Sequence, residues 1–393
     1  MKVVDVTEFW SERGGGVRSY LTSKARGLTT LGVEHRVLAS GPRTEETVLN
    51  QGESAVSRLV RLAGPALPYD PTYHLFTRFG AVRRRLRREA PDVLEIHSPQ
   101  LAALAALAAP ESAFRVRTLV WHSDFIDTYL SGQIAARSSE RVASIVTAPL
   151  WSWVRAVTDR CSATLVASAY QASKLRAQGV VRVTEMPFGV DTATFRPEAR
   201  DPGFRARFLG ERRVPLLVSV GRLASEKRTD VLIEGFRRLR ARREAVLLIY
   251  GDGPERARLQ ASARDLPDVV FLGFEQNRTE LSRALASSDV LVHAGPFETF
   301  GLVVAEARAC ATPVVVAAAG AAGELASPDC SEKYAACDAH AFSAAVERLL
   351  TRDRAQLSAC ARAAATRVLS VNQHFRALLS LYRDLLSENR ERG

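Results

Sequence analysis

The chain is poor in the features that mark secreted, zinc-binding and membrane-spanning proteins. It has 393 residues but only five cysteines, which are Cys161, Cys310, Cys330, Cys337 and Cys360. The number is odd and no pair has metal-site spacing, so neither a disulfide framework nor a zinc site is predicted. The longest apolar runs, Leu101–Ala109 and Val314–Ala322, are too short to span a bilayer.

Two further absences narrow the class of protein. The first ten residues, MKVVDVTEFW, lack the apolar segment of a signal peptide and are typical of a strand, so we expect a cytoplasmic protein. No acidic pair stands where it would hold a metal-bound diphosphate, since Asp5 and Asp201 are isolated. We therefore expect neither a metal nor another cofactor.

Lysine is scarce, because it supplies five of the 54 basic residues and arginine supplies the other 49. The net charge of +11 draws the protein toward anionic surfaces. The densest basic cluster lies on a predicted helix with Val82 and Leu86 on its inner stripe, and consists of Arg83, Arg84, Arg85, Arg87 and Arg88. Two interpretations are open, a solvated helix face and contact with anionic lipid at the inner membrane face. Nucleic acid is not expected as a partner, since no basic motif is interleaved with aromatics.

The remaining composition, 47% hydrophobic and 25% charged, is that of a globular protein long enough for two domains. Apolar strands alternate with helices such as Val17–Leu31 and Ala169–Gln178. The predicted strands of the first half are Val3–Val6, His35–Ala39, Asp92–Ile96, Arg115–Trp121, Ala163–Ala167 and Arg182–Met186. Those of the second half are Pro215–Val220, Val246–Tyr250, Val269–Leu272, Val290–His293 and Pro313–Val316. The alternation indicates an α/β fold with two doubly wound parallel sheets.

A polar segment at 195–214 marks the boundary between the domains. We assign residues 1–200 to the first domain and residues 213–370 to the second. An amphipathic helix, 371–389, ends the pattern. Ligands bind at the carboxyl ends of the strands in such sheets, so we expect the site in a cleft between the domains.

Two glutamates stand eight positions apart in the segment PFETFGLVVAEARACATP. We expect Thr299 to cap a helix that runs to about Cys310, with Glu298 on the loop before it and Glu306 two turns inside. The start of such a helix can bind a phosphate, and a carboxylate within it can accept hydrogen bonds from ribose hydroxyls. Chance spacing of solvated or capping residues is the alternative.

Three glycines, Gly14, Gly15 and Gly16, follow the first strand and precede a helix. Their N–H groups can approach a phosphate or a sugar closely. The spacing is not GxGxxG, which argues against a nicotinamide site, and a flexible loop without a ligand is the alternative.

Arg222 and Lys227 lie in the loop after the strand Pro215–Val220. Two cations at the carboxyl end of a strand can neutralise a diphosphate, the guanidinium as a fork and the ammonium as a point charge. The alternative is a solvated loop in which Glu226 pairs with them.

His122 directly follows the strand Arg115–Trp121. A histidine at that position can act as a general base or bind sugar hydroxyls. Asp124 would either orient it or cap a helix, and a purely structural histidine is the alternative.

Taken in order, these segments resemble the retaining nucleotide-sugar glycosyltransferases of family 4, which have the GT-B fold. The resemblance covers nearly the whole chain and rests on GGGV at 14–17, PFGVDTATFRP at 187–197, GRLASEKR at 221–228, YGDGPER at 250–256 and the two glutamates. It implies two Rossmann-like domains that face each other across a cleft. The first would bind the acceptor, with the final helix packed back on it, and the second would bind the donor.

The resemblance also implies roles for individual residues. Arg222 and Lys227 would bind the donor diphosphate, with catalytic effect. Glu306 would bind the ribose and Glu298 the hydroxyls of the transferred sugar, while His122 would lie near the anomeric carbon. The remaining donor contacts would come from Gly15, Gly16, Gly221, Gly251, Phe274, Thr299, Phe300, Gly301 and Leu302.

Two departures from the family pattern concern the sugar. Gly295 and Pro296 stand where members often have a serine. In the stretch AAAGAAGEL, either Gly320 or Gly323 would approach the sugar, and the sequence does not distinguish them.

We therefore predict transfer of a hexosyl unit (mannosyl, glucosyl or N-acetylhexosaminyl) from a nucleoside diphosphate sugar to an acceptor hydroxyl, with retention and without a metal. The acceptor would be a sugar, a lipid-linked compound or a natural product. Enzymes that hydrolyse or epimerise nucleotide sugars, or phosphorolyse a disaccharide, share the fold and form the alternative. A non-catalytic module that binds anionic surfaces is a further one.

Overall fold

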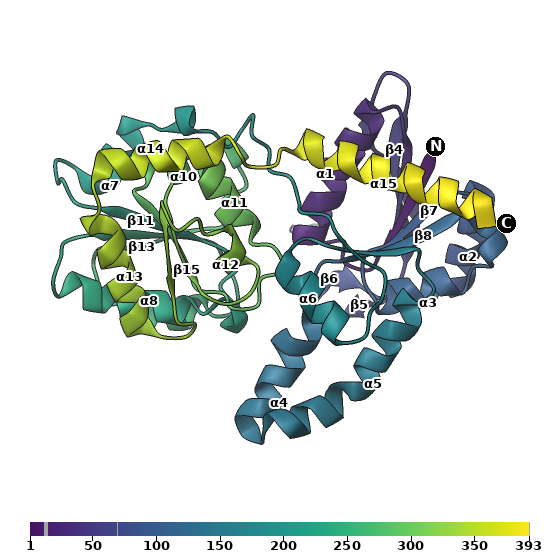
Figure 1. Ribbon diagram of the computed structural model, residues 1–393, viewed down its shortest axis with the longest axis horizontal. Helices are drawn as coiled ribbons and strands as arrows, with labels where there is room; N and C mark the ends of the chain where they lie inside the picture. The colour runs from purple at the N-terminus through teal and green to yellow at the C-terminus, as the bar shows by residue number, and fades with distance from the viewer. Residues whose placement is uncertain (12–14, 69, 393) are drawn as a thin grey trace. The chain divides into compact units, whose positions relative to one another are not determined.

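The computed structural model describes residues 1–11, 15–68 and 70–392, which form two compact units (Figure 1). Unit 1 contains Met1–Pro187 and Val371–Gly393, and unit 2 contains Phe188–Ser370. Residues 188–200, which the sequence analysis assigned to the first domain, therefore belong to the second unit. The physical reason is packing: Phe195 is 1% exposed, and Ser282 Oγ donates to Thr194 O at 2.7 Å.

Unit 1 is built on an eight-stranded sheet in the order β10-β9-β8-β7-β1-β2-β4-β3. Its pairs are parallel except for β3 with β4. The strands are β1 Lys2–Thr7, β2 Glu34–Gly41, β3 Glu45–Gln51, β4 Val56–Ala63, β7 Val93–Ile96, β8 Val116–Trp121, β9 Ala163–Val166 and β10 Val183–Glu185. A separate antiparallel pair consists of β5 Ala66–Leu67 and β6 Asp70–His74.

Helices connect these strands, and buried apolar side chains of the strands and helices form the core of unit 1. They are α1 Gly16–Thr30, α2 Phe79–Glu89, α3 Leu101–Leu107, α4 Gly132–Arg137, α5 Glu140–Thr158, α6 Ala169–Ala177 and, from the end of the chain, α15 Val371–Arg392. The final helix was predicted as 371–389. In Figure 1 it lies beside α1, and the ring of Phe375 fills the space above Gly27 of that helix, 2.3 Å from a Cβ built there.

Unit 2 is built on a six-stranded parallel sheet in the order β13-β12-β11-β14-β15-β16. The strands are β11 Leu216–Val220, β12 Val246–Tyr250, β13 Val269–Gly273, β14 Val290–His293, β15 Val314–Ala317 and β16 Ser331–Tyr334. The helices are α7 Pro202–Leu209, α8 Thr229–Arg240, α9 Arg256–Ser262, α10 Arg278–Ser287, α11 Leu302–Ala309, α12 Ala322–Leu325, α13 Ala339–Thr351 and α14 Arg354–Ala365. As both faces are covered, the central strands are continuous apolar runs, as predicted.

Each sheet grows in one direction from its first strand and later in the opposite direction from that same strand. In unit 2 the chain adds β12 and β13 on one side of β11 and then returns to add β14, β15 and β16 on the other. In unit 1 the same reversal falls between β1 and β7. Loops that leave neighbouring strands at such a switch point diverge and form a crevice, which is where open α/β sheets bind ligands.

Candidate functional site

Lys227 and Glu298 meet at the switch point of unit 2. Lys227 ends a short 3-10 helix, Ser225–Lys227, that follows β11, and Glu298 lies on the loop after β14. The lysine ammonium is 2.5 Å from Glu298 Oε1, and Nε2 of His293 is 3.1 Å from the same oxygen. Because β11 pairs directly with β14, the fold brings together two side chains that are 71 positions apart.

These neighbours hold Glu298 in its ionised form. Burial would raise the pKa of Glu298, but Lys227 and His293 outweigh it and lower that pKa below its ordinary value. An ionised carboxylate only accepts hydrogen bonds, which suits the hydroxyls of a sugar. The ammonium carries three protons, so it can bind a phosphate oxygen while it remains bonded to Glu298.

The loops after β11, β12 and β13 brace one another at the same edge of the sheet. Gly221 N donates to Tyr250 O at 3.0 Å, and Gly251 N donates to Gly273 O at 2.7 Å. A Cβ on Gly251 would lie 1.8 Å from Gly221 O at a φ of +141°, so glycine is required there. Arg222 directly follows Gly221 and is exposed. The predicted cation, Arg222, therefore lies on a loop that is hydrogen-bonded to its neighbour at the carboxyl ends of the strands.

Glu306 is buried in α11 and pairs with Arg278 at the start of α10. The side chain of Glu306 is 3% exposed and that of Arg278 is 53% exposed. Burial raises the pKa of Glu306, although Arg278 lowers it. A ribose that reached Glu306 would have to contact or displace the guanidinium, so the predicted ribose site stays a prediction and now includes Arg278.

The helix that holds this glutamate begins later than predicted. It starts at Leu302, its cap is Gly301 with a φ of +85°, and no side chain caps it. The prediction that Thr299 caps the helix is therefore wrong, because the left-handed turn at Gly301 separates Thr299 from the first residue of the helix. Phe300 packs on Phe188 with ring centroids 5.5 Å apart, and this contact anchors the loop before the turn. Leu302 is 36% exposed.

The other predicted donor contacts lie on both units. Phe274 directly follows β13 and is 58% exposed, so it presents an aromatic face at the carboxyl edge of the unit 2 sheet. In unit 1, Gly15 caps α1, which begins at Gly16, and both glycines are exposed. Gly14 lies outside the described residues.

Gly320, and not Gly323, supports the loop that contains Glu298. At a φ of +65°, a Cβ on Gly320 would lie 2.6 Å from Pro296 O and 3.1 Å from Glu298 N. We expect Gly320→Ala to displace this loop at a cost of about 1–3 kcal/mol and to weaken donor binding by roughly tenfold or more, as measured by calorimetric titration.

Gly323→Ala is the matched control, because a Cβ there would meet its nearest atom, Ala317 O, at an ordinary 3.4 Å. It should bind the donor as the native chain does. Equal losses of affinity in the two variants would refute the role of Gly320.

In unit 1, His122 follows β8 and meets His97, which follows the neighbouring strand β7. Nε2 of His122 lies 2.7 Å from Nδ1 of His97. Asp124, which was considered as the group that orients His122, binds Lys174 through its carboxylate instead. Its carbonyl accepts from Thr128 N at 2.9 Å, at the start of the next helical turn. The orienting partner that the structure provides for His122 is thus His97.

A buried charged cluster, which was not predicted, joins five elements of unit 1. Asp5 in β1 and Glu95 in β7 are register partners, so their carboxylates lie side by side. The ammonium of Lys24 in α1 lies 2.8 Å from Asp5 and 2.6 Å from Glu95. Tyr382 of α15 donates to Glu95 at 2.6 Å, and Nε2 of His35 is 2.7 Å from Asp5. All five residues are fully buried.

The two carboxylates of this cluster, together with His97, form the donor set of a metal site. Ligand atoms of Asp5, Glu95 and His97 lie within 4.8 Å of one another. The ammonium of Lys24 binds both carboxylates, however, and so supplies the positive charge that a metal would otherwise bring.

The arginine cluster lies on α2, where Val82 and Leu86 face the core as predicted. Arg85 differs from the rest, because it pairs with Glu46 at 2.8 Å and with Glu89 at 2.7 Å. The exposed members are Arg83, Arg84, Arg87 and Arg88. Membrane contact through these four stays a prediction. Within the described residues, no helix is long and apolar enough to cross a bilayer.

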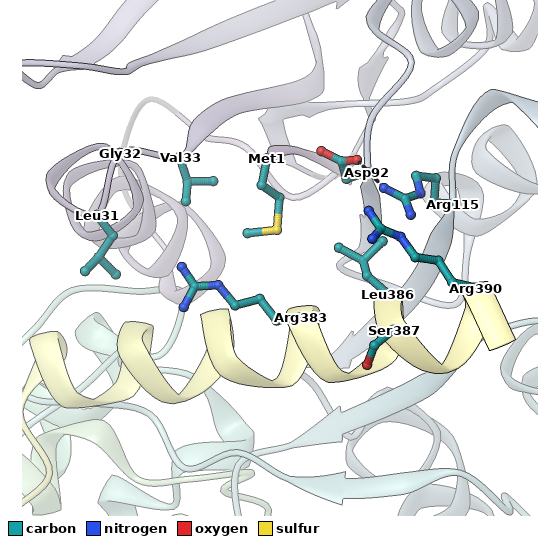
Figure 2. Close-up of a pocket in the computed structure, with 10 residues that line it drawn as sticks. All are labelled: Met1, Leu31, Gly32, Val33, Asp92, Arg115, Arg383, Leu386, Ser387 and Arg390. Carbon is teal, nitrogen blue, oxygen red and sulfur yellow. Dashed lines mark hydrogen bonds and ion pairs between the residues drawn. The ribbon is translucent and has the colours of Figure 1, made fainter.

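A pocket of about 440 Å³ lies at the opposite, amino edge of the unit 1 sheet. Figure 2 shows Met1, Val33, Asp92 and Arg115, which precede four neighbouring strands, facing one side of α15. Arg115 pairs with Asp92 at 3.2 Å. The predicted site residues are not among the residues that line this pocket.

Besides the buried cluster, three partners of the predicted site residues were missed by the sequence analysis. His293 is the last residue of β14 and His97 directly follows β7. Both therefore carry the same signal, a histidine at the carboxyl end of a strand, that singled out His122. Arg278 carries no such signal, because it begins a helix 28 positions before its partner Glu306.

Comparison with protein families places two models along the chain. Residues 14–194 match the model described as Glycosyltransferase Family 4, and residues 205–367 match the model described as Glycosyl transferases group 1. The two matches cover the larger part of unit 1 and of unit 2 in turn.

Individual proteins agree with these matches. The chain is 31% identical over 378 residues to a GDP-mannose-dependent alpha-(1-6)-phosphatidylinositol dimannoside mannosyltransferase of Mycobacterium tuberculosis, which covers 93% of this chain and 94% of the relative. Among solved structures, sucrose-phosphate synthase of Thermosynechococcus elongatus has a TM-score of 0.78 at 18% identity, with 98% and 99% coverage. The Anabaena protein HepE in complex with UDP has a TM-score of 0.68 at 17% identity, with 97% and 100% coverage. At these identities the two structures show the fold.

Proposed function

The chain belongs to the family 4 glycosyltransferases and has the GT-B fold, and from this premise we propose that it transfers a mannosyl unit from GDP-mannose to a hydroxyl of a mannosylated glycolipid. That it is a glycosyltransferase using a nucleotide sugar follows from the family. The sugar, the base and the acceptor are the proposal, and the name of the mycobacterial relative supports them.

The observation that carries the proposal is the ion pair of Lys227 and Glu298. It lies at the switch point between β11 and β14, where an open α/β sheet binds its ligand. The pair offers a cation for a diphosphate and an ionised acceptor for sugar hydroxyls within 2.5 Å of each other. A nucleoside diphosphate sugar carries these two complementary groups at adjacent positions.

The proposed reaction breaks the bond between the anomeric carbon and the diphosphate oxygen, and the electron pair leaves with the diphosphate. The acceptor oxygen forms the new bond on the face from which the diphosphate departs, and its proton passes to the departing phosphate. Arg222 and Lys227 stabilise the charge that develops on the leaving group, so the proposed reaction needs no metal.

Retention through a covalent intermediate would require a carboxylate nucleophile. Glu298 is a poor candidate, because its Oε1 already accepts bonds from Lys227 and His293. Those bonds reduce its nucleophilicity, so attack on the departing face is the mechanism that we propose.

The experiment is a calorimetric titration of the protein with GDP, UDP and ADP in turn, without added metal, followed by product analysis with GDP-mannose and a phosphatidylinositol mannoside. We expect GDP to bind and the product to carry an α-linkage. Binding of UDP or ADP in place of GDP would refute the mannosyl donor but not the family. Equal release of mannose with and without acceptor would favour the hydrolase alternative.

A further inference from the structure

His97 and His122 form a pair of imidazoles at the carboxyl ends of β7 and β8. Nδ1 of His97 lies 2.7 Å from Nε2 of His122, and the rings stack with centroids 5.0 Å apart and planes 28° apart. His97 is 1% exposed, whereas His122 is half-buried. At that distance one nitrogen must donate and the other must accept. The proton therefore belongs either to Nδ1 of His97 or to Nε2 of His122.

The other nitrogen of His97 decides between these two. Its Nε2 lies 3.5 Å from Asp5 Oδ1 and 3.6 Å from Glu95 Oε1. Both neighbours are carboxylate oxygens, which only accept hydrogen bonds. A lone pair aimed at two negative oxygens would be repelled, whereas an N–H aimed at them is attracted. The proton of a neutral His97 therefore belongs on Nε2.

The nearby ammonium of Lys24 does not change the position of this proton. Lys24 has three protons, and it donates them to Asp5 at 2.8 Å, to Glu95 at 2.6 Å and to the hydroxyl of Tyr382 at 3.0 Å. The three donors are thus used, and none remains for the ring of His97. With its proton on Nε2, His97 offers a lone pair on Nδ1, and Nε2 of His122 must be the donor.

His122 itself is held neutral. Burial lowers the pKa of His122, His97 and Lys24 lower it further, and Asp5 opposes them without reversing the shift. A neutral imidazole with its proton on Nε2 has an unprotonated Nδ1, which is an acceptor. The two carboxylates of the buried cluster thereby fix, through His97, which nitrogen of His122 can accept a hydrogen bond.

We propose that His97 is a positioning residue, which locks His122 in the Nε2–H tautomer so that its Nδ1 accepts a hydrogen bond from a sugar hydroxyl. The inference rests on the proposed function, because a bound sugar is the group that would use this nitrogen. It adds to that function a proton arrangement that extends from the core of unit 1 to the carboxyl ends of β7 and β8. A wrong tautomer would turn the acceptor into a donor and lose that bond.

The first measurement is nitrogen NMR of the full chain with labelled histidine and no ligand. The chain has seven histidines, and the His122 signals are assigned by their loss in His122→Asn. We expect a protonated Nε2 and an unprotonated Nδ1 at His122. A protonated Nδ1 at His122 in the native chain overturns the proposal, and the variant that this measurement needs is a folded His122→Asn for the assignment.

Kinetics provide the second measurement. His97→Phe keeps the ring but removes the acceptor, and should lower kcat by about 10- to 100-fold while KM for the donor stays the same. His97→Asn returns an acceptor oxygen near the position of Nδ1 and should restore most of kcat. An unchanged kcat in His97→Phe, or no recovery in a folded His97→Asn, overturns the proposal.

The matched control is His35→Phe. His35 is also buried and bonds to the same Asp5 at 2.7 Å, but it lies on β2 and its other nitrogen bonds to Ser57 at 2.8 Å. It should disturb the buried cluster and leave the tautomer of His122 unchanged. Failure of the native chain to bind any nucleoside diphosphate would refute the proposed function, whereas the tautomer measurement would still decide the inference.

Discussion

Replacement of Lys227 by alanine is expected to lower kcat/KM for the nucleotide sugar by about 10²- to 10³-fold. The leaving diphosphate loses the ammonium that stabilises its developing charge. Glu298, whose side chain is 17% exposed, loses the counter-charge 2.5 Å away that holds its pKa low. As that pKa rises, Glu298 is held less firmly in the ionised form that accepts hydroxyl donors, although His293 still favours that form. Steady-state kinetics with varied donor would measure the loss.

Two further variants make this result specific. Glu298→Gln keeps the shape of the side chain, removes its charge and should lower kcat/KM to a similar extent. Lys333→Ala removes an exposed lysine on the edge strand β16 of the same unit and should change neither rate nor affinity. Full activity in Lys227→Ala, with its circular dichroism spectrum unchanged, would exclude the cation role.

Lys24→Met is expected to cost about 3–5 kcal/mol of the free energy of unfolding. The substitution keeps the length of the side chain but removes the charge between Asp5 and Glu95, which are register partners on adjacent strands. Two buried carboxylates would then repel each other without a cation. Urea unfolding followed by tryptophan fluorescence would measure the loss.

The pH dependence of this variant gives a second test. Burial raises the pKa of Asp5, but Lys24, His35 and His97 outweigh it and lower that pKa well below the ordinary value. A lowered pKa in the folded state means that the stabilisation is complete above the ordinary carboxyl pKa and is lost as pH falls through the lowered one. In Lys24→Met the pKa of Asp5 should rise, so the deficit in stability should shrink as the pH is lowered.

Tyr382→Phe is a variant of the same cluster with a smaller expected loss, against which the loss in Lys24→Met can be compared. Tyr382→Phe removes one hydroxyl from the same cluster and should cost about 1–2 kcal/mol, since Glu95 keeps its bonds to Lys24 and Thr118. A loss below about 1 kcal/mol in Lys24→Met would show that the cluster is not a network of interdependent charges.

The sequence predicted the parallel strands well, because each is a continuous apolar run between helices. Val246–Tyr250 and Val290–His293 agree with the structure at both ends. It missed β3, a largely exposed edge strand whose pattern is polar, and β4, whose apolar run is interrupted by Arg58 and Arg61. It also missed β16, whose segment SEKY contains two charged residues. Burial on both faces leaves a clear signal in a sequence, whereas an edge strand or a strand interrupted by charged residues does not.

Candidate site residues were predictable where a charged residue or a histidine lies on the loop that follows a strand. Lys227, Glu298 and His122 satisfy that condition, and their specific roles stay predictions. The partners of these residues were not predictable in the same way. Arg278 reaches Glu306 from another helix, and Lys24 reaches Glu95 from the middle of α1. Such contacts depend on how helices cross strands, which local pattern does not record.

The return of α15 to unit 1 has a consequence for biosynthesis. Tyr382 completes the bonding of Lys24, a residue 358 positions earlier in the chain. A ribosome adds about 5–20 residues per second, so unit 1 waits roughly 10–40 s after residue 187 before the helix that covers its core emerges. During that interval the whole of unit 2 is synthesised, and unit 2 can fold while unit 1 still lacks its final helix. The nascent first half is therefore the segment that should depend most on chaperones.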